Sequence, residues 1–350
     1  MKFGIQFFPD IGPEEKSAAD YWGESLELVD LCDDLGYHHV RTVEHYFHRY
    51  GGYSTNPVVF LAAASQRTRK ARLITGAILP VFNHPLKVAG EIGMLDAISG
   101  GRLEVGFARA FLPHEFRTFG RSLDESRDRF DEGVEQVRRL LEEENVSSDG
   151  RFHQFSNVTS LPRPTQAPRP PFWIAATSAD QSFAMAGTGG HGLMTFPRDP
   201  EGLRARLKIY RDAWRAAGHP GNGQVMIAFH MFCAPTTAEA HSVAGHRIDA
   251  YLKAQYDAAS DWAEGTTSKD YPTHPQLTET LGKMSFANKL GDGSMWVGTP
   301  DEIKGMINFY HDAVGGFELA SLQVNFHTMK VKTAEESMRL FAQEIMPEFA

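Results

Sequence analysis

Short runs of β-forming residues alternate along this chain with longer stretches in which apolar residues recur at helical spacing. The first run, Lys2–Phe8, is rich in Ile and Phe and predicts a strand. In the next stretch, apolar residues have the i, i+3, i+4, i+7 spacing of one helix face, and they are Leu28, Leu31, Cys32 and Leu35. Gly36 predicts the end of this helix, because glycine readily adopts the left-handed conformation of a C-cap.

The same strand–helix unit recurs to the end of the chain. The predicted strands are Lys2–Phe8, His39–Val43, Ala71–Leu79, Arg102–Ala108, Phe172–Ala176, Gly192–Phe196, Gln224–Ala234 and Ser321–Phe326. The predicted helices are Tyr21–Leu35, Pro57–Thr68, Pro85–Ile98, Asp124–Glu144, Ala179–Ala186, Glu201–Ala217, one starting near Ala238, Pro300–Val314 and Glu335–Ile345. Such alternation is typical of a parallel sheet. Eight units favour a closed (β/α)₈ TIM barrel over an open doubly wound sheet.

Two stretches do not fit the repeating unit. The polar segment 145–160 predicts an excursion from the barrel, and 264–293, rich in Gly, Thr, Ser, Asp and Pro, predicts a long loop or lid. No stretch of low complexity divides the chain, so we expect one barrel domain over residues 1–350 with these two excursions.

Charge and composition exclude several classes of partner and compartment. The chain has 35 Lys and Arg against 44 Asp and Glu, a net charge of −9, which disfavours nucleic acid or an anionic membrane surface as a partner. No apolar run approaches the roughly 18 residues of a membrane span, and the start, MKFGIQFFPD, lacks the pattern of a signal peptide. The two cysteines, Cys32 and Cys233, form neither a disulfide framework nor a zinc site. We therefore expect a cytoplasmic protein.

Several common catalytic motifs are missing from the sequence. The first strand is followed by Phe-Pro-Asp rather than by a Gly-x-Gly-x-x-Gly loop, and neither a Walker-type loop nor a Gly-x-Ser-x-Gly elbow occurs. Glu44, His45 and His48 could suggest a metal site, but their spacing in a predicted loop is not that of a zinc helix. We expect no metal site, and we expect both cysteines to be small buried residues.

In a barrel of this kind, function resides where the strands end. Arg109 follows the fourth strand, where it could bind an anion or form an ion pair with Glu115 or another nearby acid. Thr177 and Ser178 precede the fifth helix, where they could bind an anion together with the first backbone amides or act as plain N-caps. Together these residues, on adjacent strands, suggest a phosphorylated ligand.

Small and aromatic residues at strand ends indicate a flat ligand. Gly76-Ala77 leaves a gap in the third strand, which either a ring against the backbone or tight barrel packing would explain. The chain holds 24 Phe, and Phe8, Phe111 and Phe196 near strand ends are candidate pocket walls. An ordinary packed core is the alternative for each of them.

These positions also carry a family resemblance, which extends over nearly the whole chain. The chain resembles the bacterial luciferase-like flavin-dependent monooxygenases. The segments that carry the resemblance are MKFGIQFF, EHYFHRYGGYSTNP, TGAILPVFNHP, LDAISGGRLEVGFARAF, FRTFG, PPFWIAATSADQSF, WVGTPDEI and MRLFAQEIMPEF, in this order. The resemblance implies a (β/α)₈ barrel with an excursion near the seventh strand.

The resemblance also implies roles for individual residues. His45 matches the family's active-site histidine, Arg109 and Ser178 match residues that hold the flavin phosphate, and Gly76-Ala77 matches a cis peptide bond under the flavin ring. The cofactor-binding positions implied in this way are Gly76, Ala77, Ala108, Arg109, Ala176, Thr177, Ser178 and Gln181. Ala108 stands where luciferase has a reactive cysteine, Thr177 replaces its glutamate and Gln181 its threonine, which indicates a non-luminous member.

The activity implied is that of a two-component monooxygenase. Reduced FMN, supplied by a separate flavin reductase, would react with O₂ to a flavin 4a-hydroperoxide that oxygenates a small organic substrate. His45 would be the general acid or base, or a hydrogen-bond donor. The resemblance also implies a homodimer, and it leaves the substrate open among aldehydes, alkanesulfonates, amines and aromatic polyketides.

Three alternatives remain. A deazaflavin-dependent dehydrogenase of the same superfamily would hold its cofactor phosphate in a similar way but would consume no oxygen. A flavin-binding protein without turnover would be expected to lack the active-site histidine. The presence of His45 therefore argues against this alternative. A metal hydrolase on a barrel would lose activity with chelators and need no flavin.

Overall fold

Eight parallel strands close into a barrel in the computed structural model, which describes residues 1–349. The barrel strands are β1 (Lys2–Phe7), β2 (His39–Thr42), β3 (Arg72–Thr75), β4 (Leu103–Phe107), β7 (Phe172–Ala175), β8 (Gly192–Thr195), β9 (Val225–Cys233) and β11 (Leu319–Gln323). Each strand pairs in parallel with its neighbours, and pairing between β8 and β9 together with pairing between β1 and β11 closes the ring. The predicted (β/α)₈ TIM barrel is confirmed, and all eight predicted strands are present.

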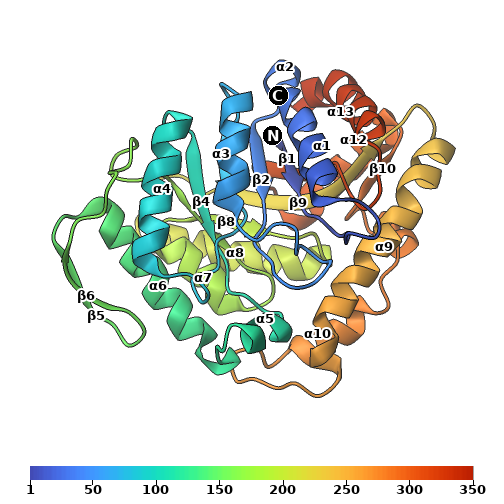
Figure 1. Cartoon of the computed structure of the whole chain (residues 1–350). Helices are drawn as coiled ribbons and strands as arrows, with labels where there is room; N and C mark the ends of the chain where they lie inside the picture. The colour runs from blue at the N-terminus through green and yellow to red at the C-terminus, as the bar shows by residue number, and fades with distance from the viewer. Residues whose placement is uncertain (350) are drawn as a thin grey trace.

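Helices surround the barrel (Figure 1). They are α1 (Ala18–Asp30), α2 (Cys32–Leu35), α3 (Pro57–Arg67), α4 (Pro85–Ser99), α5 (Pro113–Thr118), α6 (Ser126–Glu142), α7 (Asp180–Thr188), α8 (Pro200–Ala216), α9 (Thr237–Ala263), α10 (His274–Leu281), α11 (Phe286–Gly291), α12 (Pro300–Val314) and α13 (Val331–Glu344). The residues that were predicted to cap helices do so in two cases. The side chain of Asn56 accepts hydrogen bonds at the start of α3, and Gly36 ends α2 with φ +79°.

The barrel interior is built from alternate residues of each strand, because successive side chains of a strand point to opposite faces. Ile74, Trp173, Met194, Met226 and Leu319 form one interior cluster of apolar side chains. The other set of strand residues packs outward against the helices, in a much larger apolar core. The alternation along each strand therefore identifies which side chains point into the barrel, and those near the carboxyl ends of the strands lie at its open end.

Both predicted excursions leave the barrel, and each has regular structure that the sequence analysis did not anticipate. Residues 145–160 contain an antiparallel hairpin, β5 (Val146–Asp149) with β6 (Gln154–Val158). The segment 264–293 is not only a loop, because it contains the short helices α10 and α11. The analysis also missed α5 and the short strand β10 (Trp296–Gly298), which pairs in parallel with the last residues of β9, Met231–Cys233.

Two further observations concern the chain as a whole. Within residues 1–349, no helix has both the length and the apolar character that are needed to cross a membrane. Cys32 and Cys233 are free and buried, and burial raises the pKa of the Cys233 thiol to about 12. Both therefore behave as small buried residues, as predicted.

Candidate active site

His45 is held by a buried carboxylate. It follows β2, and its Nδ1 atom lies 3.1 Å from Oε1 of Glu115, which belongs to α5. The same oxygen accepts a hydrogen bond from the backbone N–H of Tyr46 at 2.9 Å. The Glu115 side chain is fully buried, whereas that of His45 retains 11% exposure. A carboxylate only accepts hydrogen bonds, so Nδ1 carries the proton and Nε2 is left as the ring atom for a ligand.

Aromatic rings surround His45. The ring centroid of Phe8 lies 5.4 Å from that of His45 and 4.5 Å from that of Tyr50, and the centroid of Phe111 lies 6.2 Å from that of His45. Two of the three predicted pocket walls, Phe8 and Phe111, therefore meet at the histidine. Phe196 is 36% exposed and follows β8, with the same parity as the interior residue Met194.

The Gly76–Ala77 peptide bond is cis, as the resemblance implies. A Cβ atom at Gly76 would lie 1.9 Å from Nε of Arg41, and Nη2 of Arg41 donates to the carbonyl of Gly76 at 2.8 Å. Glycine at this position is therefore required by the close approach of Arg41. This finding supports tight barrel packing as the reason for the gap, and it identifies a buried arginine that the sequence analysis missed. Arg41 lies four positions before His45, and the only signal in the sequence was a charged residue inside a predicted strand.

Arg109 is half-buried after β4, and it contacts the 264–293 segment rather than an acid. Its Nη2 donates to the carbonyl of Asp270 at 2.9 Å, and its guanidinium carbon lies 4.5 Å from the ring centroid of Tyr271. Its Nε has no partner among residues 1–349. The predicted alternative of an ion pair with Glu115 is wrong, because Glu115 is bonded to His45.

The 264–293 segment lies over this end of the barrel and is held there by several hydrogen bonds. Just before the segment, Trp262 in the last turn of α9 donates to the carbonyl of Phe111 at 2.9 Å. Ser268 donates to the carboxylate of Asp124 at 2.6 Å. The hydroxyl groups of Ser126 and Tyr271 lie 2.5 Å apart. These contacts place the segment as a cover beside Arg109 and Phe111.

The amino end of α7 is free of side-chain caps. Its N-cap residue is Ala179, and no side chain accepts a hydrogen bond there. The predicted alternative of plain capping by Thr177 or Ser178 is therefore not observed. Instead, the carbonyl groups of these two residues accept hydrogen bonds from Arg198 and Arg206, the latter at 3.1 Å.

These two arginines were missed because they lie in the loop after β8 and in α8, remote in sequence from α7. They lie at the amino end of α7, where first-turn amides favour an anion, and Arg206 also pairs with Asp180 of the first turn at 3.3 Å. Of the other implied positions, Ala176 is buried, Ala108 half-buried and Gln181 exposed.

The interior of the open barrel end has a polar half and an apolar half. On the adjacent strands β9, β11, β1 and β2, the interior residues are His230, Ser321, Gln323, Gln6 and Arg41. On β3, β4, β7 and β8, they are small or apolar, and they are Ile74, Gly76, Gly106, Ala108, Ala175, Met194 and Phe196. The parity of β11 continues to Asn325 beyond its end.

Several buried polar atoms in the polar half have no partner within the described chain. They are Nε of Arg41, Nε2 of His230, Oγ of Ser321, Oε1 of Gln323 and both amide atoms of Asn325. Buried polar atoms are normally bonded, so an unpaired group of donors and acceptors indicates a ligand with a polar edge. A flavin ring has one polar and one apolar edge, so these residues fit that cofactor.

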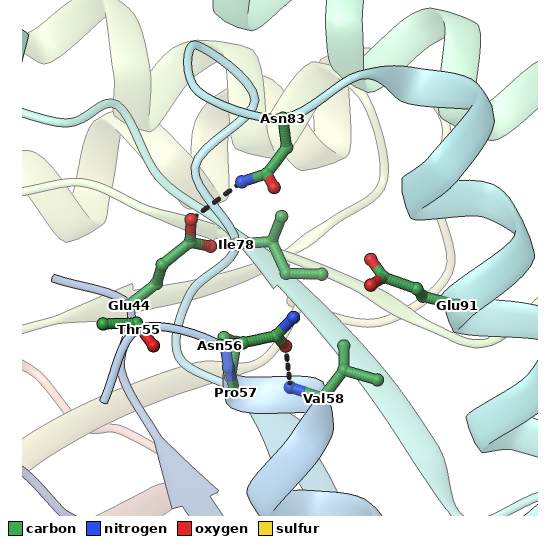
Figure 2. A pocket seen from close by; sticks show the side chains of 8 residues that line it. All are labelled: Glu44, Thr55, Asn56, Pro57, Val58, Ile78, Asn83 and Glu91. Carbon is green, nitrogen blue, oxygen red and sulfur yellow. Dashed lines mark hydrogen bonds between the residues drawn. The ribbon is translucent and has the colours of Figure 1, made fainter. Parts of the chain in front are cut away.

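A second buried carboxyl group, Glu44, lies beside this region. It accepts hydrogen bonds from the Asn83 side chain at 2.7 Å and from the backbone of Leu79 at 3.0 Å. Burial raises the pKa of Glu44 to about 7. Figure 2 shows its carboxyl group turned toward Asn83, at a small pocket that also includes Asn56 and Glu91. Glu44 is thus part of the wall between β2, α3 and α4.

Histidines near the site do not form a metal centre. Within residues 1–349, no group of three or more His, Cys, Asp or Glu side chains is placed to hold a metal ion. The ring of His48 lies 5.8 Å from that of His114, and its Nδ1 accepts a hydrogen bond from the backbone of Tyr50 at 3.1 Å.

The sequence is similar to those of several known proteins. The chain is 24% identical to the oxygenase component of the flavin-dependent trigonelline monooxygenase of Acinetobacter baylyi, over 100% of this chain and 96% of that protein. An uncharacterized protein of Sinorhizobium fredii is 36% identical over 190 residues, and this alignment covers about half of each chain, 54%.

Two solved structures, both of monooxygenases, are similar to this chain over nearly its whole length. The crystal structure of the monooxygenase RslO1 from Streptomyces bottropensis is 44% identical, with a TM-score of 0.89 over 100% of both chains. The oxygenating constituent of 3,6-diketocamphane monooxygenase from Pseudomonas putida, solved in complex with FMN, has the same fold. It is 20% identical, with a TM-score of 0.83 over 99% of this chain and 98% of that one.

The family model described as luciferase-like monooxygenase matches residues 1–315, which include every residue of the site described above except Ser321, Gln323 and Asn325. On this match and the 44% identity to RslO1, the chain is a monooxygenase and belongs to the luciferase-like monooxygenase family.

Proposed function

We propose that this protein is the oxygenase component of a two-component system that uses reduced FMN and O₂ to oxygenate a small organic substrate. The observation that carries the proposal is the convergence of the His45–Glu115 pair, the Phe8 and Phe111 rings and the half-polar barrel mouth at one end of the barrel. The oxygenase component from Acinetobacter and the FMN complex from Pseudomonas support the choice of cofactor and of a reductase partner.

The chain's own residues have three tasks in this scheme. Arg109, Ser178 and the first amides of α7 would hold the phosphate, with Arg198 and Arg206 adding positive charge nearby. The aromatic residues and the 264–293 cover would exclude water from the reacting groups. Glu115 would keep the proton of His45 on Nδ1, so that Nε2 can accept a proton from the substrate or return it.

When bound, the reduced flavin supplies the two electrons with which one oxygen atom enters the substrate and the other leaves as water. The anchoring of Arg109 by Asp270 and Tyr271 has a consequence for binding. A phosphate at Arg109 would compete with the Asp270 carbonyl, so we propose that cofactor entry loosens the cover at this contact.

The outer faces of α3 and α4 support the proposed homodimer. These helices lie side by side (Figure 1), and large apolar side chains on or beside them are exposed, namely Val59 (70%), Met94 (59%), Ile98 (42%) and Leu161 (72%). A helix that carries apolar residues on its outer face is normally covered. We propose that a second copy of the chain covers this surface.

The test is to incubate the protein with a flavin reductase, NAD(P)H, FMN, O₂ and a panel of aldehydes, sulfonates, amines and polycyclic aromatic phenols. The expected result is a product heavier by one oxygen atom, with the label from ¹⁸O₂, that does not form when this protein is left out. A deazaflavin-dependent dehydrogenase would incorporate no label from ¹⁸O₂ and would transfer a hydride instead. Failure of the protein to bind FMN in either redox state would contradict the proposal.

A further inference from the structure

Arg41 is a charged side chain inside the barrel without an acidic partner. It lies on β2, is 3% exposed and points to the interior. Its Nη1 donates to the side-chain carbonyl of Gln6, and Nη2 donates to the carbonyl of Gly76 at 2.8 Å. Its Nε has no partner, and no carboxylate is among the groups that act on its charge. Both acceptors that it has are therefore neutral.

An arrangement of this kind is costly. Transferring a charge from water to a protein interior without a counter-ion is strongly unfavourable, and neutral acceptors recover only part of the lost hydration. Burial lowers the pKa of Arg41 to about 10, so the side chain remains a cation at neutral pH. The buried, unpaired charge of Arg41 therefore indicates that a bound ligand supplies a negative charge beside it.

The surroundings of Arg41 provide a second and independent observation. Gln6 is in register with Arg41 on one side and with Gln323 on the other, so the three residues form a row across β2, β1 and β11. Oε1 of Gln323 and both amide atoms of Asn325 are buried and unpaired. The row thus offers a cation, hydrogen-bond donors and hydrogen-bond acceptors on one side of the barrel mouth, opposite the small residues Gly106 and Ala108.

We propose that Arg41 is the countercharge for a planar, delocalised anion at the barrel mouth, and that this anion is the reduced isoalloxazine ring of the flavin. The inference rests on the proposed function. A guanidinium group suits such a ligand, because its own charge is delocalised over a plane and its donors have fixed directions. Arg41 contacts Gly76 of the peptide that the family resemblance places against the ring. Asn325 and Gln323 would complete the polar edge.

The consequence is a preference for one redox state. The oxidised ring is neutral, whereas the reduced ring can carry a negative charge, so a fixed cation stabilises the reduced form selectively. An oxygenase that receives its cofactor from a separate reductase has to capture the reduced flavin and release the oxidised one. Arg41 would provide that discrimination without touching the phosphate end of the ligand.

The test is an anaerobic titration of the protein with oxidised FMN and with dithionite-reduced FMN. Arg41→Gln should weaken binding of reduced FMN by at least about tenfold, as expected for the loss of one nearby opposite charge, and leave oxidised FMN nearly unchanged. Arg41→Lys, which keeps the charge, should retain most of the preference. Arg102→Gln is the matched control, because Arg102 is a partly buried arginine just before β4 that donates to the carbonyls of Ser99 and Ala71.

A spectroscopic readout separates this role from a merely structural one. In the wild type, the absorbance of bound reduced FMN should show the anionic form down to a lower pH than in Arg41→Gln, by about one pH unit or more. If Arg41→Gln does not fold, as judged by circular dichroism, Arg41→Met replaces it, because an apolar side chain of similar length suits a buried site.

Each outcome bears on the proposal. An unchanged ratio of reduced to oxidised affinity in a folded Arg41→Gln protein would overturn it. If that variant instead lost affinity only for phenolate or carboxylate compounds, the anion would belong to the substrate, and the assignment to the flavin would be wrong. A wild type that binds neither form of FMN would refute the proposed function itself. That result differs from failure of the Arg41 proposal alone, in which the wild type still binds FMN.

Discussion

The Nδ1 atom of His45 lies 3.1 Å from the Oε1 atom of Glu115, although the two residues are 70 positions apart in the chain. One residue comes from the loop after β2 and the other from α5 after β4. The carboxylate oxygen also binds the Tyr46 amide, so its position is held from two sides. The pair is therefore rigid before any ligand arrives, which is what a proton-transferring histidine needs.

The first prediction concerns this pair. His45→Ala should lower turnover by about 10²–10⁴-fold, the range for loss of a general acid or base. Glu115→Gln should lower it less, because the ring remains but its tautomer is no longer determined. The measurement is kcat for product formation, with FMN affinity as the control. The double variant should be no slower than His45→Ala alone, and full turnover of His45→Ala would exclude the role.

The second prediction concerns the phosphate. Arg109→Ala should weaken FMN binding by about 10–100-fold, the equivalent of one hydrogen bond to a charged group, and leave riboflavin binding unchanged. Fluorescence titration with both ligands measures the difference. Arg117→Ala is the matched control, since Arg117 is exposed and pairs with Asp261. Equal losses for FMN and riboflavin would place Arg109 away from the phosphate.

The third prediction concerns Gly76. A Cβ atom there would overlap the Arg41 side chain, so Gly76→Ala should lower the free energy of unfolding by about 1–3 kcal/mol, as overpacking does. Arg41→Ala removes the overlapping atoms, and the double variant should be more stable than the sum of the single effects. Gly23→Ala in α1, where nothing lies within 4 Å, is the control. Denaturant unfolding measures all four, and additive effects would contradict the contact.

The fourth prediction concerns pH. Burial lowers the pKa of His230 to about 3 and that of His191 to about 4. Both folded values are below the unfolded value of about 6.5, so the unfolded chain binds more protons in this range. Stability should fall as the pH drops from about 6.5 toward 4, by up to about 1.4 kcal/mol per pH unit for each histidine. His191→Gln should flatten this dependence by one such step in thermal unfolding, and an unchanged slope would contradict the shift.

The fifth prediction concerns association. Met94→Glu places a charge on the exposed apolar face of α4, and it should convert the proposed dimer to a monomer in light scattering after gel filtration. Phe309→Glu, at another exposed apolar residue on α12, serves as the control and should leave the dimer intact. A wild type that is monomeric at micromolar concentration would contradict the proposed dimer.

The sequence by itself determined the architecture. Period-two and period-3.6 patterns, with glycine and proline at the boundaries, locate eight strands and the helices between them, because these signals are local. The same reasoning made Arg109, Phe8 and Phe111 candidates, since a barrel confines function to the ends of its strands, whereas the role of His45 was implied by the family resemblance. The short elements α5, α10 and α11 were missed, because a few turns carry little periodic signal.

Only the tertiary structure decided which of these residues act on each other. Glu115 is a candidate partner for Arg109 in the sequence and a partner of His45 in the fold, because the loop after β4 turns α5 back over β2. Arg41 reads as one polar residue in a buried strand, and its unpaired charge becomes evident only when β1, β2 and β3 enclose it. Contacts of this kind depend on distances between strands that are far apart in the chain, and residue spacing along a sequence does not record them.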